Sequence, residues 1–254
     1  MSGDLKKFGG NVYSQNGEDG ILAEIFHRLQ ITEGFAVEFG AWDGRYLSNA
    51  FNLIENKHWR GLFIEGDPMK YSALLKTASA FPGMQTMCAM VGFEGDSSLD
   101  RLLAQADVRR DFEMLSIDID SYDLEVWRAL ETYRPKVVVI ESNAALGPRI
   151  VSTHRPPESL YASFAALLEV GKAKGYELVC HNGNCFFVLG ELVPALGLDQ
   201  ALLANPERLF DYRKCRKERL INLLRKLIPQ RWLYAAFNFS DRIKEARKRE
   251  RRAN

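Results

Sequence analysis

The chain has 254 residues, of which 46% are hydrophobic and 26% charged, and its formal net charge at pH 7 is +1. This length suits one large α/β domain with an appendage and is short for two full domains. The four cysteines have no CxxC spacing, which argues against zinc motifs and is typical of reduced, packed thiols in a cytoplasmic protein. The first ten residues have no apolar signal core, and no run of about 18 apolar residues occurs, so we expect neither secretion nor a membrane span.

Charge is distributed unevenly along the chain. Residues 211–254 contain 15 Lys and Arg against 5 Asp and Glu, a formal charge of +10. The preceding residues contain 19 against 28, a formal charge of −9. We therefore predict an acidic globular domain over residues 1–205 and a basic helical tail over residues 206–254, with the boundary near Asn205 to Asp211.

The segment YSQNGED, residues 13–19, precedes an amphipathic helix in ILAEIFHRL. Asn16 and Asp19 are of the types that cap the N-terminus of such a helix. Capping leaves the polar residues Tyr13, Ser14 and Gln15 without a role, so residues 12–30 are also a candidate lid over a ligand.

The next segment, FAVEFGAWDGRYLSN at residues 35–49, predicts a buried strand that ends beside an acid and opens into a glycine-containing loop. Gly40 and Gly44 allow a sharp turn and a close approach to a ligand, and Ser48 and Asn49 offer polar contacts where a helix begins. This order is typical of the first unit of a nucleotide-binding α/β domain, although an ordinary strand-to-helix turn shares its features.

A second strand over Leu62 to Ile64 ends at Glu65, which lies 25 positions past Gly40. That spacing is close to the one at which an acid of a dinucleotide-binding fold accepts hydrogen bonds from ribose hydroxyls. A helix N-cap is the alternative role for Glu65. Asp67 before Pro68 already suits that cap, which favours ribose binding by Glu65.

Further acids follow the later predicted strands. The strand at 114–119 leads into Asp118 and Asp120, which are two apart and therefore share one face, and then into Asp123, which suits a helix cap. The β-branched run KVVVI at 136–140 is typical of a central parallel strand and ends at Glu141 and Asn143. Acids on buried strands need a partner or a cation.

The remaining segments complete an alternation of strands and helices. Residues 144–157, including His154, predict a substrate-facing loop before a helix at 160–174. Two final strands join at Asn182-Gly183, a strong hairpin signal that makes the last strand antiparallel. These elements predict a sheet of parallel strands with one reversed edge member. The terminal hairpin points to the class I methyltransferase fold, which is a Rossmann-like, seven-stranded sheet in the order 3-2-1-4-5-7-6 with the last strand antiparallel between the fifth and the sixth. The GAWDG loop lacks the G-x-G-x-x-G of dinucleotide oxidoreductases.

The motifs YSQNGEDG, AVEFGAWDGRYLSN, GLFIEGDP, LSIDIDSYDLEVW and VVVIESN resemble the FkbM-type family of S-adenosylmethionine-dependent methyltransferases over about residues 12–190. The resemblance implies that residues 38–43 hold the methionine end of S-adenosylmethionine, that Glu65 binds its ribose, and that Gly95 to Ser97 line its adenine. Family members often have Gly where this chain has Ser121. The predicted cofactor-binding residues are Gln15, Glu38, Gly40, Ala41, Asp43, Ser48, Asn49, Glu65 and Asp118.

The predicted activity is O-methylation of a carbohydrate hydroxyl in surface glycan or polysaccharide biosynthesis. Methylation of a small natural product and a non-catalytic scaffold are the alternatives. Asp120 or His181 is the candidate general base. Oxygen ligands of this kind suit Mg²⁺, Mn²⁺ or Ca²⁺, although the same groups also suit hydrogen bonds to the cofactor and nearby amides. The candidate metal ligands are Asp118, Asp120, Glu141 and Asn143.

The basic tail contains an apolar stripe at helical spacing, and Trp232, Tyr234 and Phe237 follow it. One interpretation is a helix packed on the domain or on a second subunit of a homodimer. The other is an interfacial helix that holds a cytoplasmic enzyme at the anionic inner membrane face, where a lipid-linked glycan is presented. Nucleic acid is disfavoured as a partner because no stacking platform or recognition motif accompanies the charge.

Overall fold

The computed structural model describes residues 4–119, 121–153 and 161–227. The chain divides into two units, Met1–Asp211 and Tyr212–Asn254, which are described separately. None of the described helices combines the length and apolar character that a membrane span requires.

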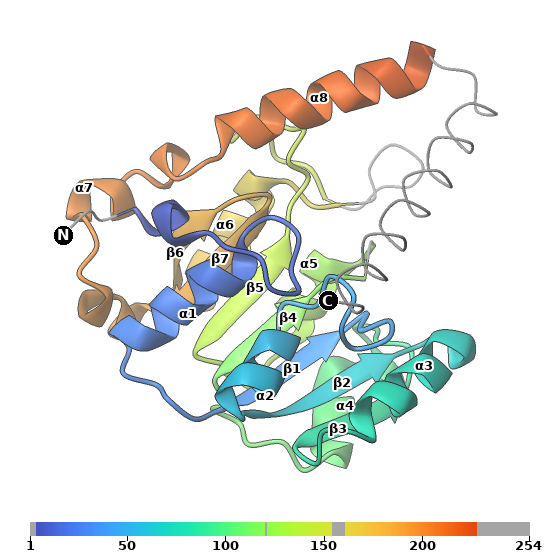
Figure 1. The fold of residues 1–254 in the computed structure, drawn as a ribbon. Coiled ribbons are helices and arrows are strands. Elements are labelled where there is room, and N and C mark those ends of the chain that lie inside the picture. Colours follow the sequence, from blue (N-terminus) through green and yellow to red (C-terminus); the bar gives the residue numbers. More distant parts are fainter. Residues whose placement is uncertain (1–3, 120, 154–160, 228–254) are drawn as a thin grey trace, which may run out of the picture. The chain divides into compact units, whose positions relative to one another are not determined.

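The first unit is built on one seven-stranded sheet in the order β3-β2-β1-β4-β5-β7-β6 (Figure 1). Strand β7 runs antiparallel to both β5 and β6, whereas the other neighbouring pairs are parallel. The predicted strand order and the reversed last strand are both confirmed. The strands are β1 (Phe35–Phe39), β2 (Arg60–Glu65), β3 (Met84–Cys88), β4 (Met114–Ile117), β5 (Val137–Glu141), β6 (Tyr176–His181) and β7 (Asn184–Leu189).

Helices cover both faces of this sheet (Figure 1). They are α1 (Glu18–Arg28), α2 (Phe51–Lys57), α3 (Pro68–Ala78), α4 (Leu99–Gln105), α5 (Asp123–Ala129), α6 (Phe164–Ala173) and α7 (Gln200–Leu203), with short 3-10 helices at Leu5–Phe8, Gly95–Ser97, Gly190–Leu196 and Pro206–Arg208. One core cluster joins α1, α2 and α3 to strand residues such as Val139 and Phe186. On the opposite face, Trp127 of α5 packs on Phe187 of β7, with ring centroids 4.8 Å apart.

Local chemistry explains several element boundaries. Asp67 caps α3 by accepting hydrogen bonds from the backbone N–H groups of Met69 and Lys70, with Pro68 as the first helical residue, as predicted. The tight hairpin between β6 and β7 contains Gly183 at a φ of +116°, a conformation that glycine adopts readily. Strand β4 ends at Ile117, two residues before the predicted end.

The second unit begins with α8 (Tyr212–Leu227), a helix of 16 residues. The aromatic residues Trp232, Tyr234 and Phe237 of the predicted tail lie outside the described residues.

Candidate active site

The carboxyl ends of the central strands form one row of residues. Phe39 pairs with Ile117, Ile117 pairs with Ile140, and Glu141 pairs with Asn184. The residues that come next along β1 and β4 are Gly40 and Asp118, so these two continue the row that contains Glu141 and Asn184. In this row the Asp118 carboxyl group is next to Gly40, which has no side chain, and Glu141 and Asn184 follow on the next two strands.

Gly40 is the position where the loop after β1 passes closest to the end of β4. Its φ is +73°, and a Cβ there would lie 1.9 Å from the carbonyl oxygen of Asp118. No side chain fits in that space, and the backbone conformation itself disfavours residues other than glycine. The absence of a side chain therefore lets the loop backbone approach the end of β4 closely.

Glu38, near the end of β1, holds the far end of this loop. Its carboxylate accepts hydrogen bonds from the Ser48 hydroxyl and, at 2.8 Å, from the backbone N–H of Asn49. The Asn49 amide in turn donates to the Ser116 hydroxyl on β4 at 3.1 Å. Burial raises the pKa of Glu38, while these hydrogen bonds oppose the rise. Three residues predicted to bind the cofactor, Glu38, Ser48 and Asn49, thus bond to one another and shape the loop.

Glu65, at the end of β2, reaches across to the same loop. One carboxylate oxygen accepts from the backbone N–H of Trp42 at 2.7 Å, and the other accepts from that of Asp67 at 2.8 Å. Each carboxylate oxygen can accept more than one hydrogen bond, so these contacts leave acceptor capacity for ribose hydroxyls.

Asp43 and Ala41 complete the loop. The Asp43 carboxylate accepts from the backbone N–H groups of Arg45 at 2.9 Å and Tyr46 at 2.7 Å, which closes a tight turn. Ala41 donates its N–H to the carbonyl of Ile64 at 3.2 Å and so ties the loop to β2. The loop is therefore held from β1, from β2 and from within.

The predicted cap of α1 by Asn16 and Asp19 is wrong. The N-cap residue is Gly17, and no side chain caps the helix. One oxygen of Asp19 instead accepts from the backbone N–H groups of Val12, Tyr13 and Ser14, each at 2.8 Å, because residues 12–14 fold back over the helix start. The other oxygen of Asp19 is buried and has no hydrogen-bond partner among the described residues.

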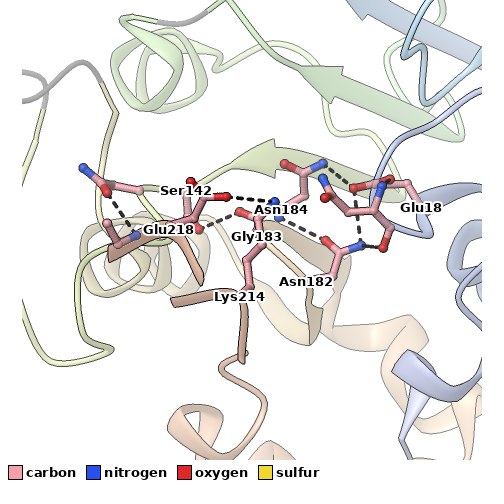
Figure 2. Close-up of polar contacts among 10 residues, drawn as sticks. Glu18, Ser142, Asn182, Gly183, Asn184, Lys214 and Glu218 are labelled. Carbon is pink, nitrogen blue, oxygen red and sulfur yellow. Dashed lines mark hydrogen bonds and ion pairs between the residues drawn. The ribbon is translucent and has the colours of Figure 1, made fainter. Parts of the chain in front are cut away.

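A buried network joins the start of α1 to the tip of the β6–β7 hairpin (Figure 2). Glu18 is fully buried, and its carboxylate accepts from the side-chain amides of Asn182 at 3.3 Å and Asn184 at 3.1 Å. It also accepts from the backbone N–H of Asn16 at 2.7 Å, and Asn182 donates to the Asn16 carbonyl at 3.0 Å. The hairpin tip thus holds the N-terminal segment at the carboxyl end of the sheet.

A second contact joins this segment to the loop after β1 and to α2. The Tyr13 hydroxyl donates to Glu55 of α2, and Arg45 bonds to the Tyr13 hydroxyl at 3.3 Å and to Glu55 at 3.2 Å. Burial, followed by the hydrogen bond to Glu55, raises the pKa of Tyr13. Gln15, between the two contacts, is exposed. The sequence did not indicate these contacts of Glu18, Arg45, Asn182 and Asn184, and only Glu18 had a signal, the density of polar residues in YSQNGED.

His181, a candidate general base in the sequence analysis, lies inside the protein. Its ring is fully buried and stacks on Phe210 with centroids 4.8 Å apart. Nδ1 accepts from the backbone N–H of Asp211 at 2.9 Å, which assigns the ring proton to Nε2. Nε2 then donates to the Ser142 hydroxyl at 2.9 Å, and that hydroxyl donates to the carbonyl of Gly183 at 2.7 Å. This geometry is that of a structural histidine and gives a substrate no access to the ring.

The predictions for the two acids that follow Asp118, Asp120 and Asp123, have different outcomes. Asp123 does not cap α5, whose N-cap residue is Tyr122. It is buried and accepts from the backbone N–H groups of Ile119 at 2.8 Å and Ser121 at 3.0 Å, which holds the turn after β4. Asp120, the stronger candidate base, lies outside the described residues, as does His154 of the predicted substrate loop.

The predicted metal site has no support in the structure. Within residues 4–119, 121–153 and 161–227, no three His, Cys, Asp or Glu side chains come together in a way that could hold a metal ion. The Asn143 side-chain oxygen accepts from the backbone N–H of Ala145 at 3.2 Å. Because Asp120 is not described, the full predicted ligand set stays a prediction.

Exposed aromatic side chains surround the strand ends. Trp42 and Tyr46 of the loop after β1 are 48% and 39% exposed, and their ring centroids lie 5.4 Å apart. The Lys70 ammonium lies 4.5 Å from the centroid of the Trp42 ring. Tyr122, after β4, is 44% exposed and contacts Phe93. Exposed apolar groups that follow polar strand ends are suited to contact a ligand.

The hydrogen bonds between neighbouring strands define the order and directions of the strands, and these assign the fold. It is the class I methyltransferase fold. In that fold β1 lies at the point where the strand order reverses, and ligands bind beyond the carboxyl ends of the strands at this point.

No family model matches the sequence, and no curated protein matches it. Among the solved structures to which the chain is similar are the following three. One is the citrinin polyketide synthase CMeT domain (12% identity over 70% of this chain and 55% of that chain, TM-score 0.46). The second is M. capricolum TrmK in complex with S-adenosyl-homocysteine (8%, 65% and 65%, 0.42). The third is a SAM dependent methyltransferase from Aquifex aeolicus (10%, 73% and 96%, 0.42). The resemblance to the FkbM-type family stays a prediction.

Proposed function

We propose that this protein is an S-adenosylmethionine-dependent O-methyltransferase that acts on a carbohydrate hydroxyl, in the biosynthesis of a surface glycan. The observation that carries the proposal is the loop after β1. At Gly40 a side chain would collide with the Asp118 carbonyl, so the loop backbone lies directly against the sheet at the point where the strand order reverses.

The residues around this loop fit the cofactor. The loop from Glu38 to Asp43 would hold the methionine end, because glycine leaves its backbone accessible. Glu65 would hold the ribose, since its carboxylate lies at the end of the neighbouring strand β2 and keeps acceptor capacity. The turn at Gly95–Ser97 would line the adenine.

When bound, S-adenosylmethionine supplies an electrophilic methyl group, whose transfer to a hydroxyl breaks one C–S bond and forms one C–O bond. The protein must align the acceptor oxygen and remove its proton. Asp118 and Glu141 occupy the row beside Gly40 and are suited to these tasks, together with Asp120. The acceptor proton would pass to one of these carboxylates. We do not assign this role to His181, because its ring is buried and both nitrogens are hydrogen-bonded.

The exposed aromatic residues at the strand ends support a sugar acceptor. Sugar rings have apolar C–H faces that pack on aromatic rings such as those of Trp42, Tyr46 and Tyr122, while their hydroxyls need polar partners. Transfer of a labelled methyl group to glycans, compared with small alcohols, tests this choice. We expect Tyr46→Ala to raise KM for a glycan acceptor and to leave cofactor affinity unchanged. Equal transfer to small alcohols would favour a natural-product methyltransferase.

The part of the proposal that concerns a metal has a separate test. If Asp118, Asp120, Glu141 and Asn143 bind a divalent cation, dialysis against a chelator should abolish methyl transfer, and Mg²⁺ or Mn²⁺ should restore it. Full activity after chelation would rule out a metal requirement and would leave the proposed cofactor site unaffected.

Calorimetry with S-adenosylhomocysteine tests the cofactor site directly. We expect the wild type to bind, and Glu65→Gln to bind at least about tenfold more weakly, because hydrogen bonds to a charged acceptor contribute about 1.5–3 kcal/mol each. Asp67→Asn is the matched control, since Asn also caps helices and the affinity should not change. No binding by the wild type at high ligand concentration would refute the proposal.

A further inference from the structure

Helix α8 carries an exposed apolar stripe. Leu220, Leu223 and Leu224 are 56%, 56% and 44% exposed. Their spacing of three and four residues places them on one side of the helix. Three neighbouring leucines with about half of their surface in water cost free energy unless an apolar phase or partner covers them.

The same helix is strongly basic. Residues 212–227 contain seven Lys and Arg and one Glu, a formal charge of +6. The one acid, Glu218, forms an ion pair with Lys214 at 3.3 Å on the helix itself. Arg216 and Lys217 are exposed and precede Leu220 by four and three residues, so they continue its side of the helix. Cations and leucines therefore share one face.

We propose that this face of α8 binds the surface of an anionic lipid bilayer. A bilayer offers both complements at once, because its headgroups carry negative charge and its acyl chains begin just beneath them. A second copy of the chain fits less well, since it would bring two helices of charge +6 together. Single-stranded RNA would match the charge but would leave the leucines in water.

Co-sedimentation of the full-length protein with vesicles tests the proposal. At low salt we expect pelleting with vesicles of equimolar phosphatidylglycerol and phosphatidylcholine, and none with phosphatidylcholine alone. Raising the ionic strength to about 1 M shortens the Debye length from about 8 Å to about 3 Å and should release the protein. Pelleting that is indifferent to lipid charge and salt would overturn the proposal.

Two variants of α8 test the face itself. The double variant Arg216→Gln and Lys217→Gln should lower the partition coefficient about 25-fold, because each basic residue near an anionic surface contributes about fivefold. The triple variant with Gln at Leu220, Leu223 and Leu224 should lower it at least about tenfold. Gln keeps a high helix propensity, so the helix itself should persist, which circular dichroism checks.

Matched controls alter similar residues in the first unit. Leu75 is 47% exposed, and Lys76 and Arg101 are exposed. Replacing Leu75 with Gln, or Lys76 and Arg101 together with Gln, should leave vesicle binding unchanged. If these controls reduce binding as much as the α8 variants do, general charge or hydrophobicity explains the pelleting and the proposal fails.

The same variants distinguish two other binding partners for this face of α8, a second copy of the chain and single-stranded RNA. Sedimentation velocity without lipid would reveal a dimer, and loss of that dimer in the triple leucine variant would assign the face to a second copy. Tighter binding to a labelled single-stranded RNA than to anionic vesicles, lost in the double basic variant, would assign it to RNA. Either result would overturn the lipid proposal.

Discussion

Replacing Gly40 with alanine should destabilise the first unit by about 3 kcal/mol. The φ of +73° costs an alanine about 1–2 kcal/mol. In addition, the new Cβ would lie 1.9 Å from the Asp118 carbonyl oxygen, about 1.5 Å closer than an ordinary contact. Overpacking of this kind costs a further 1–3 kcal/mol or so, since the loop or the end of β4 must move.

Urea unfolding followed by tryptophan fluorescence measures this loss. Gly197→Ala is the matched control, because Gly197 has a φ of +59° but no atom within 4 Å of a built Cβ. The control should lose only the conformational part, about 1 kcal/mol. If both variants lose the same free energy of unfolding, the close approach of Gly40 to β4 is wrong, and with it the main support for the proposed cofactor loop.

Three further predictions concern buried polar groups. Burial raises the pKa of Glu38, so its contribution to stability is present below about pH 4.3 and falls as the pH rises through the raised pKa. The free energy of unfolding of the wild type relative to that of Glu38→Gln should therefore fall as the pH rises above about 4.3, and a rise with pH would contradict this prediction. Glu18→Gln should cost about 2 kcal/mol and speed hydrogen exchange at the Asn16 amide, whereas Glu191→Gln, at an exposed ion pair with Arg134, should change stability by less than about 0.5 kcal/mol. His181→Phe should lose about 2 kcal/mol of stability yet keep its rate of methyl transfer, whereas loss of a general base would slow transfer at least about 100-fold.

The strands were predictable because local signals specify them, and their order followed from the class I methyltransferase fold that the terminal hairpin indicated. The run at 137–140 is β-branched, and Asn182-Gly183 specifies a hairpin that must reverse the last strand. The cap of α3 was predictable for the same reason, since Asp67 and Pro68 act within one helical turn. Signals that operate over a few residues survive folding largely unchanged.

The roles of individual polar residues were harder to predict, because distant segments decide them. Glu18 meets Asn184 across 166 positions of sequence, and His181 is buried by Phe210 and by the backbone of Asp211. Asp19 has the residue type of a cap, but a segment that folds back supplies its donors instead. Composition indicated that these residues were polar neighbours of a site and could not indicate their partners.

The position of β7 has a consequence for synthesis on the ribosome. This strand is made last but pairs inside the sheet, between β5 and β6, and its hairpin tip holds Glu18. Residues 12–18 therefore cannot take their described positions until the hairpin has emerged, although they were made first. We expect a nascent chain that stops before β7 to lack the contacts of Glu18 with Asn182 and Asn184, so that this end of the sheet is completed only after β7 has left the ribosome.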